Sequence, residues 1–71
     1  MKDPKPLRHK RYWARRIHRN RITVWEVREE TMNDDTPIYH MHVAEYRTKG
    51  AAVLHANRLA TIEQKRLEKL K

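Results

Sequence analysis

The clearest pattern of apolar and polar positions lies in the C-terminal third of the chain. Thr48 can cap a helix that begins there, and the pattern after it can continue to Lys71. The residues that recur at the spacing of one helical face are Ala52, Ala56, Leu59, Leu67 and Leu70, with Ile62 close by. A helix from Thr48 to Lys71 would be about 36 Å long, which is longer than a two- or three-stranded sheet can cover.

Two stretches before this helix have the pattern of β-strands. Residues 22–29 are dense in β-branched and aromatic residues, and residues 38–46 alternate larger apolar side chains with histidines and alanine. A polar loop over residues 30–37, with Asn33-Asp34-Asp35 at its tip, would join them. Because a helical crossover needs a dozen residues or more, this loop of about eight predicts an antiparallel hairpin.

The residues before residue 22 fit more than one element. Residues 1–6 contain two prolines and predict no regular element, whereas residues 7–19 fit a helix by spacing and a strand by their Tyr, Trp and Ile content. Both alternatives stay open. Residues 18–21 predict a turn, because Asn20 tolerates the left-handed conformation that a tight turn needs.

The predicted elements assemble into one small α+β domain. Its sheet has two or three antiparallel strands, and the long C-terminal helix packs on one face. Residues 1–21 form a basic N-terminal arm, which is a helix or a first strand, and residues 22–71 form the hairpin and the helix. The residues expected between sheet and helix are Trp25, Val27, Tyr39, Met41 and Val43, opposite Ala52, Ala56 and Leu59. Ile22 and Val24 point to the other face, where Trp13 and Ile17 are candidates to cover them.

Charge is distributed unevenly along the 71 residues, which carry a formal net charge of +8. The basic residues of the arm are Lys2, Lys5, Arg8, Lys10, Arg11, Arg15, Arg16, Arg19 and Arg21, against the single acid Asp3. In residues 22–71 bases and acids cancel. This division predicts a neutral folded body that carries a segment attracted to polyanions.

The junction between the second predicted strand and the helix reads Tyr46-Arg47-Thr48-Lys49-Gly50-Ala51-Ala52. It resembles the arm-type DNA-binding domain of tyrosine integrases, in which an aromatic residue ends the last of three antiparallel strands and Thr-Lys opens the helix. The resemblance covers residues 22–62, or 12–62 if the arm supplies the first strand. It implies a sheet whose face enters the major groove. The acidic residue that usually follows the Thr-Lys pair is replaced by Ala51 here.

The acidic charge of the hairpin moves the expected contact from the hairpin to the arm. Acidic residues dominate the ends of the hairpin (Glu26, Glu29, Glu30, Asp34 and Asp35), and phosphates would repel them. The double-stranded RNA-binding domain ends in a similar helix, but its basic cluster at the helix start is reduced here to Arg47 and Lys49.

The preferred function is therefore a small nucleic-acid-binding accessory protein that acts through its arm. Lysine and arginine would contact phosphates, and aromatic side chains between them offer faces for stacking on bases. The expected site residues are Arg8, Lys10, Arg11, Tyr12, Trp13, Arg15, Arg16, Arg19 and Arg21. DNA is preferred over RNA, and phosphate contacts alone imply no base selectivity.

The alternative is a protein-interaction module whose arm or hairpin docks on an acidic protein surface. It would be a small inhibitor or regulator of a host or partner protein, of the kind that phages and mobile elements encode. The amphipathic C-terminal helix also offers a surface for a homodimer, although its pattern is short for a coiled coil.

Other classes of function are not expected. The chain has no cysteine, which excludes disulfides and thiolate chemistry. His40 and His42 share a strand face at a spacing that some metal sites use, but further ligands are missing, so no metal is expected. We also expect no enzyme activity, cofactor or small-molecule substrate, because a chain of this size has little room for a substrate pocket. We expect no membrane association and a cytoplasmic location, because no apolar segment or secretory signal is present.

Overall fold

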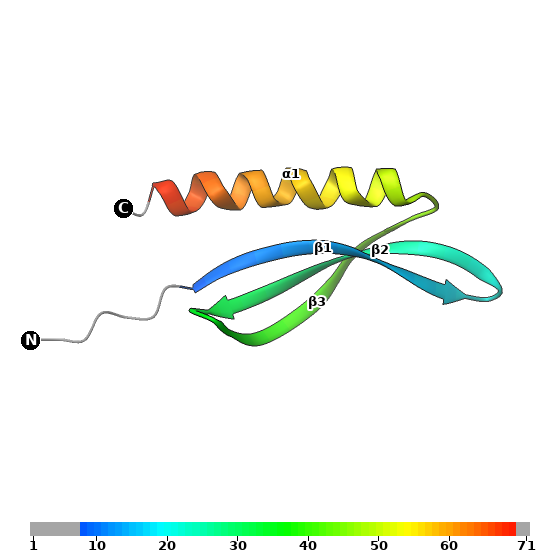
Figure 1. Ribbon diagram of the computed structural model, residues 1–71, viewed down its shortest axis with the longest axis horizontal. Helices are drawn as coiled ribbons and strands as arrows, with labels where there is room; N and C mark the ends of the chain where they lie inside the picture. The colour runs from blue at the N-terminus through cyan, green and yellow to red at the C-terminus, as the bar shows by residue number, and fades with distance from the viewer. Residues whose placement is uncertain (1–7, 70–71) are drawn as a thin grey trace, which may run out of the picture.

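The computed structural model describes residues 8–69, which form three strands followed by one helix (Figure 1). The elements are β1 (Arg8–Arg19), β2 (Ile22–Asn33), β3 (Thr36–Tyr46) and α1 (Lys49–Glu68). The strands form one antiparallel sheet in the order β1-β2-β3, and α1 packs against it. The predicted α+β fold, with a small antiparallel sheet and one long C-terminal helix on one face, is confirmed.

Strand β1 decides between the two conformations that residues 7–19 allowed. It pairs with β2 along its whole length, from Arg8 opposite Asn33 to Arg19 opposite Ile22. The sheet supplies opposite charges for this basic segment, because two arginines of β1, Arg11 and Arg15, face glutamates of β2 across the ladder. The predicted turn is also present: Asn20 and Arg21 join the strands with φ angles of 50° and 66°.

The second connection is shorter than the sequence predicted. Instead of a loop over residues 30–37, β2 continues to Asn33, β3 begins at Thr36, and only Asp34 and Asp35 form the turn. The prediction was wrong because polar residues extend a strand when the neighbouring strand satisfies them. Glu30, for example, bonds to Arg11 on β1.

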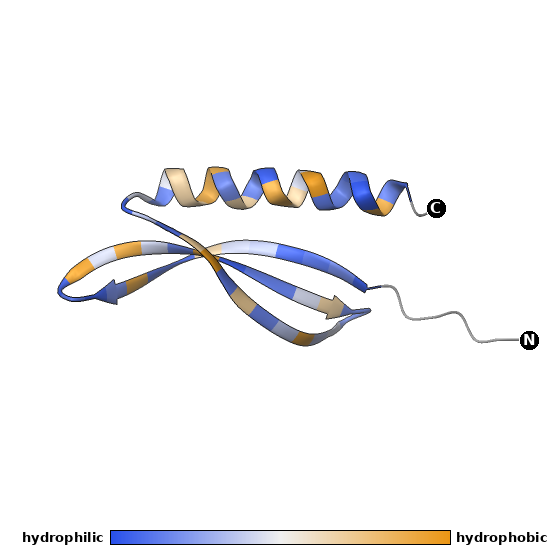
Figure 2. Ribbon diagram, turned by 180° about the vertical axis from the view of Figure 1, so that it is seen from behind, coloured by the Kyte–Doolittle hydropathy of each residue, from blue (hydrophilic) through white to orange (hydrophobic). Residues whose placement is uncertain are grey.

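The hydrophobic core lies between α1 and the nearer face of the sheet. Its buried centre consists of Val27, Ala52 and Ala56, surrounded by the partly buried residues Tyr12, Ala14, Trp25, Val43, Ala44, Tyr46 and Leu59. The alanines let the helix approach the sheet closely. Apolar residues occur in short patches along the ribbon (Figure 2), so the core is thin, as expected for this chain length.

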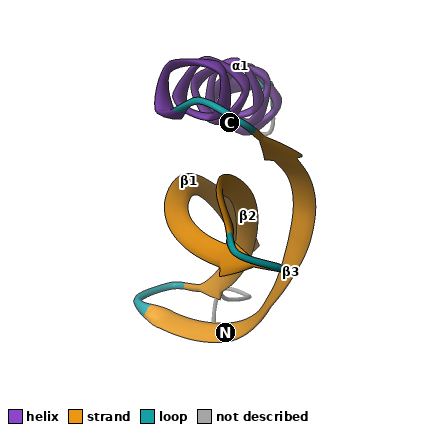
Figure 3. Cartoon of the chain, turned by 90° about the vertical axis from the view of Figure 1, so that its right-hand side faces the viewer, coloured by secondary structure: helices purple, strands orange, loops and turns teal. Residues whose placement is uncertain are grey.

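Three apolar residues that we expected in or near the core lie outside it. The side chains of Tyr39 and Met41 are exposed at 55% and 44%, and Ile62 on α1 is also exposed. Strand β3 has two irregularities, opposite Val27/Arg28 and opposite Thr31/Met32. It curves around the sheet and reaches the helix only at its C-terminal end (Figure 3), so its first half lies away from α1.

Helix α1 begins as the sequence predicted. Thr48 is its N-cap, and the Thr48 hydroxyl accepts a hydrogen bond of 3.3 Å from the backbone N–H of Ala51. The helix has 20 residues, runs back along the sheet from the end at which β3 stops, and ends at Glu68. Leu70, which we placed on its apolar face, lies outside the described residues. In residues 8–69, no helix combines the length and the apolar content that a membrane span requires.

Candidate nucleic-acid interface

Strand alternation divides the predicted site between the two faces of the sheet. Tyr12 and Ala14 of β1 pack toward α1. The alternate residues of β1 therefore point to the opposite side, which we call the open face. The predicted site residues on the open face are Arg11, Trp13, Arg15 and Arg19, and those on the helix side are Arg8, Lys10, Tyr12 and Arg16.

Three arginines on the open face form ion pairs with glutamates of β2 and β3. Arg11 Nη2 lies 2.5 Å from Glu30 Oε1, Arg15 Nε lies 2.7 Å from Glu26 Oε1, and Arg19 Nη1 lies 2.7 Å from Glu45 Oε1. The arginine side chains are 60%, 54% and 58% exposed, whereas their glutamates are only 12%, 5% and 25% exposed. The carboxylates thus lie within the sheet surface, and the guanidinium groups lie above them in solvent.

Glu26 lies at the centre of the open face and is bonded from three strands. Besides Arg15 on β1, it contacts Arg28 on its own strand at 3.0 Å and the Nδ1 atom of His42 on β3 at 2.7 Å. Burial by itself would raise the pKa of Glu26. The hydrogen bonds from His42 and Arg15 and the charge of Arg28 outweigh burial and lower the pKa to about 2. This carboxylate is therefore ionised at neutral pH and fixes the side chains around it.

A second buried carboxylate, Glu63 of α1, holds β1 from the helix side. Its Oε2 atom accepts a hydrogen bond of 2.5 Å from the backbone N–H of Lys10, and Arg66 donates to both carboxylate oxygens at 2.6 and 2.9 Å. The hydrogen bonds from Arg66 lower the pKa of Glu63, against the opposing effect of burial. Nearby, the Tyr12 hydroxyl donates to Glu29 at 3.0 Å, so burial and this bond raise the pKa of Tyr12 to about 12. Two of the predicted site residues, Lys10 and Tyr12, thus take part in contacts that hold the fold together.

Within residues 8–69, the remaining cations of the predicted site have no such partners. Among the described residues, Arg8, Arg16 and Arg21 make no ion pair. Arg16 lies opposite Trp25 in the β1–β2 ladder. The Lys49 ammonium lies 5.7 Å from the centre of the Trp25 ring, so a lysine at the start of α1 joins the side of the sheet that carries Arg16.

Sequence reasoning missed the residues that organise this surface. It treated Glu26, Glu29 and Glu30 as acids that repel phosphate from the hairpin, and it gave Glu63 no role. The available signal was charge pairing in register: once residues 8–19 are placed as a strand next to β2, basic residues of β1 fall opposite or diagonal to the acids of β2.

The buried carboxylates and Tyr12 predict how stability depends on pH. Because the pKa of Glu26 falls from 4.5 to about 2 on folding and that of Glu63 is also lowered, both stabilise the fold above pH 4.5 and lose that effect as the pH falls toward 2. Tyr12 has a raised pKa, so it stabilises the fold below pH 10, and this stabilisation is lost as the pH rises from 10 to 12. The thermal midpoint, followed by circular dichroism, should fall as the pH is lowered from about 4.5 toward 2 and as it is raised from 10 toward 12. A midpoint that is unchanged between pH 5 and 2 would contradict this assignment.

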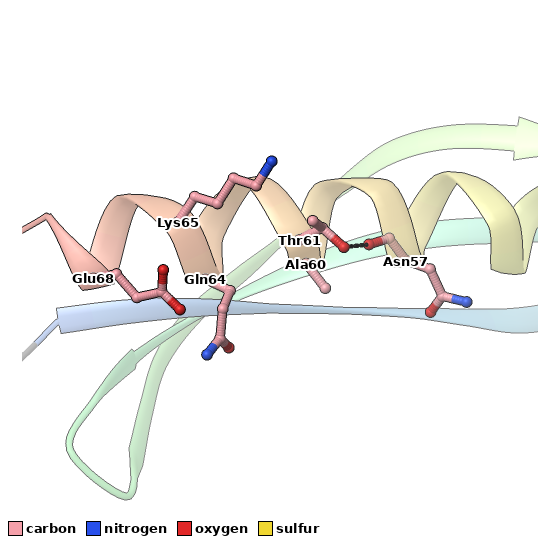
Figure 4. Close-up of a pocket in the computed structure, with 6 residues that line it drawn as sticks. All are labelled: Asn57, Ala60, Thr61, Gln64, Lys65 and Glu68. Atoms are coloured by element: carbon pink, nitrogen blue, oxygen red, sulfur yellow. Dashed lines mark hydrogen bonds between the residues drawn. The ribbon is translucent and has the colours of Figure 1, made fainter.

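A shallow hollow lies along one flank of α1. It is lined by Asn57, Ala60, Thr61, Gln64, Lys65 and Glu68, all from the same helix (Figure 4). Within it, the Thr61 hydroxyl donates to the backbone carbonyl of Asn57 at 3.0 Å. Across residues 8–69, no group of three or more His, Asp or Glu side chains is arranged to hold a metal ion. His42 of the predicted histidine pair instead bonds to Glu26, and His40 accepts a hydrogen bond from Arg28.

The arrangement on the open face suits a ligand that is large, extended and negatively charged. Exposed guanidinium groups follow one strand, and each is anchored by a carboxylate that lies deeper in the surface. Comparisons with protein-family models, with curated proteins and with solved structures give no match, so the chain is assigned to no family.

Proposed function

We propose that the protein binds nucleic acid, with DNA preferred over RNA, through the open face of β1. The observation that carries the proposal is the row of exposed guanidinium groups of Arg11, Arg15 and Arg19. These residues are four positions apart, which places successive arginines about 13 Å apart along an extended strand. Trp13 lies between the first two on the same face and offers an aromatic surface for a base.

The cross-strand glutamates reduce the positive potential of this face, but they do not occupy the arginines fully. A guanidinium has five N–H donors. Arg15 uses Nε for a hydrogen bond to Glu26, and Arg19 pairs with Glu45 without a hydrogen bond, so each retains donors for a phosphate. Since each side chain is already held by its carboxylate, less conformational entropy is lost when it meets the ligand. The expected result is a preorganised face of moderate affinity, which depends on salt.

A protein partner is the second candidate, and exposed apolar side chains favour it. Ile38, Tyr39 and Met41 are exposed together on β3, which is an edge strand of the sheet. Such a surface can contact an apolar patch on another protein. An interface of this kind should depend on one or two of these side chains, whereas binding to phosphates should decline in similar steps as arginines are removed.

Fluorescence anisotropy with labelled duplex DNA, titrated at several salt concentrations, tests the proposal. We expect the triple variant R11Q/R15Q/R19Q to bind more weakly than the native protein. If each arginine meets one phosphate, the slope of log K against log salt should become shallower by about 2.7, because each phosphate contact contributes about 0.9.

The matched control removes the same number of charges from α1 and its C-cap. Arg58, Lys65 and Lys69 are exposed and make no ion pair with a described residue, so R58Q/K65Q/K69Q changes the net charge equally without altering the open face. Equal losses in both triple variants would show that only net charge matters and would refute the site. Circular dichroism melts confirm that each variant is folded at the assay temperature.

A further inference from the structure

The hairpin of β1 and β2 extends beyond the three-stranded part of the sheet. Pairing between β2 and β3 runs from Trp25 opposite Tyr46 to Asn33 opposite Thr36, so the part of β2 before Trp25 pairs with β1 alone. Residues 17–24 therefore form a two-stranded ribbon that is closed by the turn Asn20-Arg21. We call residues 17–24 the ribbon tip. Figure 1 shows this turn reaching past the first turn of α1 at the same end of the molecule.

The ribbon tip contains three arginine or histidine residues and no acidic residue. Residues 18–23 read His-Arg-Asn-Arg-Ile-Thr, and all six are exposed. Within the tip, Thr23 and His18 share a side-chain hydrogen bond of 3.2 Å across the ribbon, and Arg19 reaches back to Glu45. Arg21 has no ion pair or side-chain hydrogen bond to any described residue. Arg21 is thus an exposed cation in the turn itself.

The backbone of the turn shows that arginine is an unfavourable residue there. Asn20 and Arg21 both have positive φ angles, 50° and 66°, as the two central residues of a type I′ turn do. Asn-Gly is the most favourable pair for this geometry, and a side chain other than Gly, Asn or Asp is strained at the second position. Strained residues are concentrated at functional sites, where a contact compensates for the strain.

We propose that the ribbon tip enters the major groove of duplex DNA, with the Arg21 guanidinium leading and donating to base edges. This inference rests on the proposed function and specifies duplex DNA as the ligand. The contact it describes is made by the turn and not by the open face of the sheet. The major groove of B-DNA is about 12 Å wide and admits a two-stranded β-ribbon, whereas the major groove of A-form RNA is deep and narrow. A ribbon that carries no carboxylate meets no repulsion from the phosphates on either side.

The variants R21G and R21N separate the role of the side chain from that of the turn. Both residues accept a positive φ angle, so the turn is retained, and R21G should raise the thermal midpoint by a few degrees, on the order of 4 °C, because the strain is relieved. At the same time, the affinity for labelled duplex DNA should fall by about fivefold or more in both variants. The affinity for duplex RNA of the same sequence should be lower than for DNA in the native protein and should change less on substitution.

Each outcome is informative. Unchanged DNA affinity in folded R21G and R21N would overturn the ribbon-tip contact. If R11Q/R15Q/R19Q still lost binding in that case, the open face would stand alone as the site. Equal losses on DNA and RNA would also overturn the major-groove assignment, because they would indicate a phosphate contact that both duplexes offer. A native protein that binds neither duplex would refute the proposed function itself.

Discussion

Replacing Glu26 with alanine is expected to destabilise the fold by about 3–5 kcal/mol. The carboxylate is buried and is the centre of contacts from Arg15, Arg28 and His42. Arg28 is the partner most affected, since its side chain is only 13% exposed and its Nε atom is already buried without a hydrogen bond. Without Glu26, a nearly buried guanidinium loses its counter-charge. Urea denaturation followed by circular dichroism measures the change, which is a large part of the total stability expected for a domain of this size.

The matched control for Glu26 is Glu30 on the same strand and face. Glu30 bonds to Arg11, whose side chain is 60% exposed and stays hydrated when its partner is removed. The substitution Glu30→Ala should therefore change the free energy of unfolding by less than about 1 kcal/mol. Similar losses in the two variants would mean that the network around Glu26 is no more important to the fold than a surface ion pair.

Replacing Glu63 with alanine is expected to have the second-largest effect on stability, about 2 kcal/mol. This carboxylate satisfies the Lys10 N–H at the outer edge of β1 and pairs with Arg66. Its removal leaves an N–H group without its partner and exposes part of a sheet edge, so concentration-dependent association should accompany the loss. Urea denaturation and size-exclusion chromatography at several concentrations measure the two effects.

Two further substitutions test the reason given for the Glu63 effect. Glu63→Gln keeps an oxygen that can accept the hydrogen bond from Lys10, so it should retain part of the stability that Glu63→Ala loses. Glu68→Ala removes an exposed carboxylate one turn further along α1 and should have little effect. If Glu63→Ala behaved like Glu68→Ala, the helix would not secure the edge of β1.

The two buried carboxylates connect the stability of the fold to the proposed binding face. Glu63 holds β1 in the sheet from the helix side, and Glu26 positions Arg15 on the open side. Both contacts are ionic or charge-assisted, so they order β1 in a protein whose hydrophobic core is thin. In the proposed function, the same strand that needs these contacts to fold presents its arginines to the nucleic acid.

The elements with strong local patterns could be predicted from the amino-acid sequence. The apolar spacing after Thr48 predicted α1 and its cap, and the β-branched residues after Arg21 predicted β2 and an antiparallel hairpin. Asn20 indicated the turn before β2. These features depend on residues that are close together in the chain, where side-chain periodicity and capping act directly. The concentration of positive charge before residue 22 was equally evident.

The tertiary structure alone decided the conformation of residues 8–19 and the use of their charges. Spacing and propensity fit a helix and a strand equally, and pairing with β2 settled the conformation, because a ladder of hydrogen bonds and ion pairs is available only in the strand. The same register determined which arginines face glutamates and which, such as Arg16 opposite Trp25, make no ion pair among the described residues. Net charge follows from the sequence, but the exposed charge depends on which residues distant in the chain fold against each other.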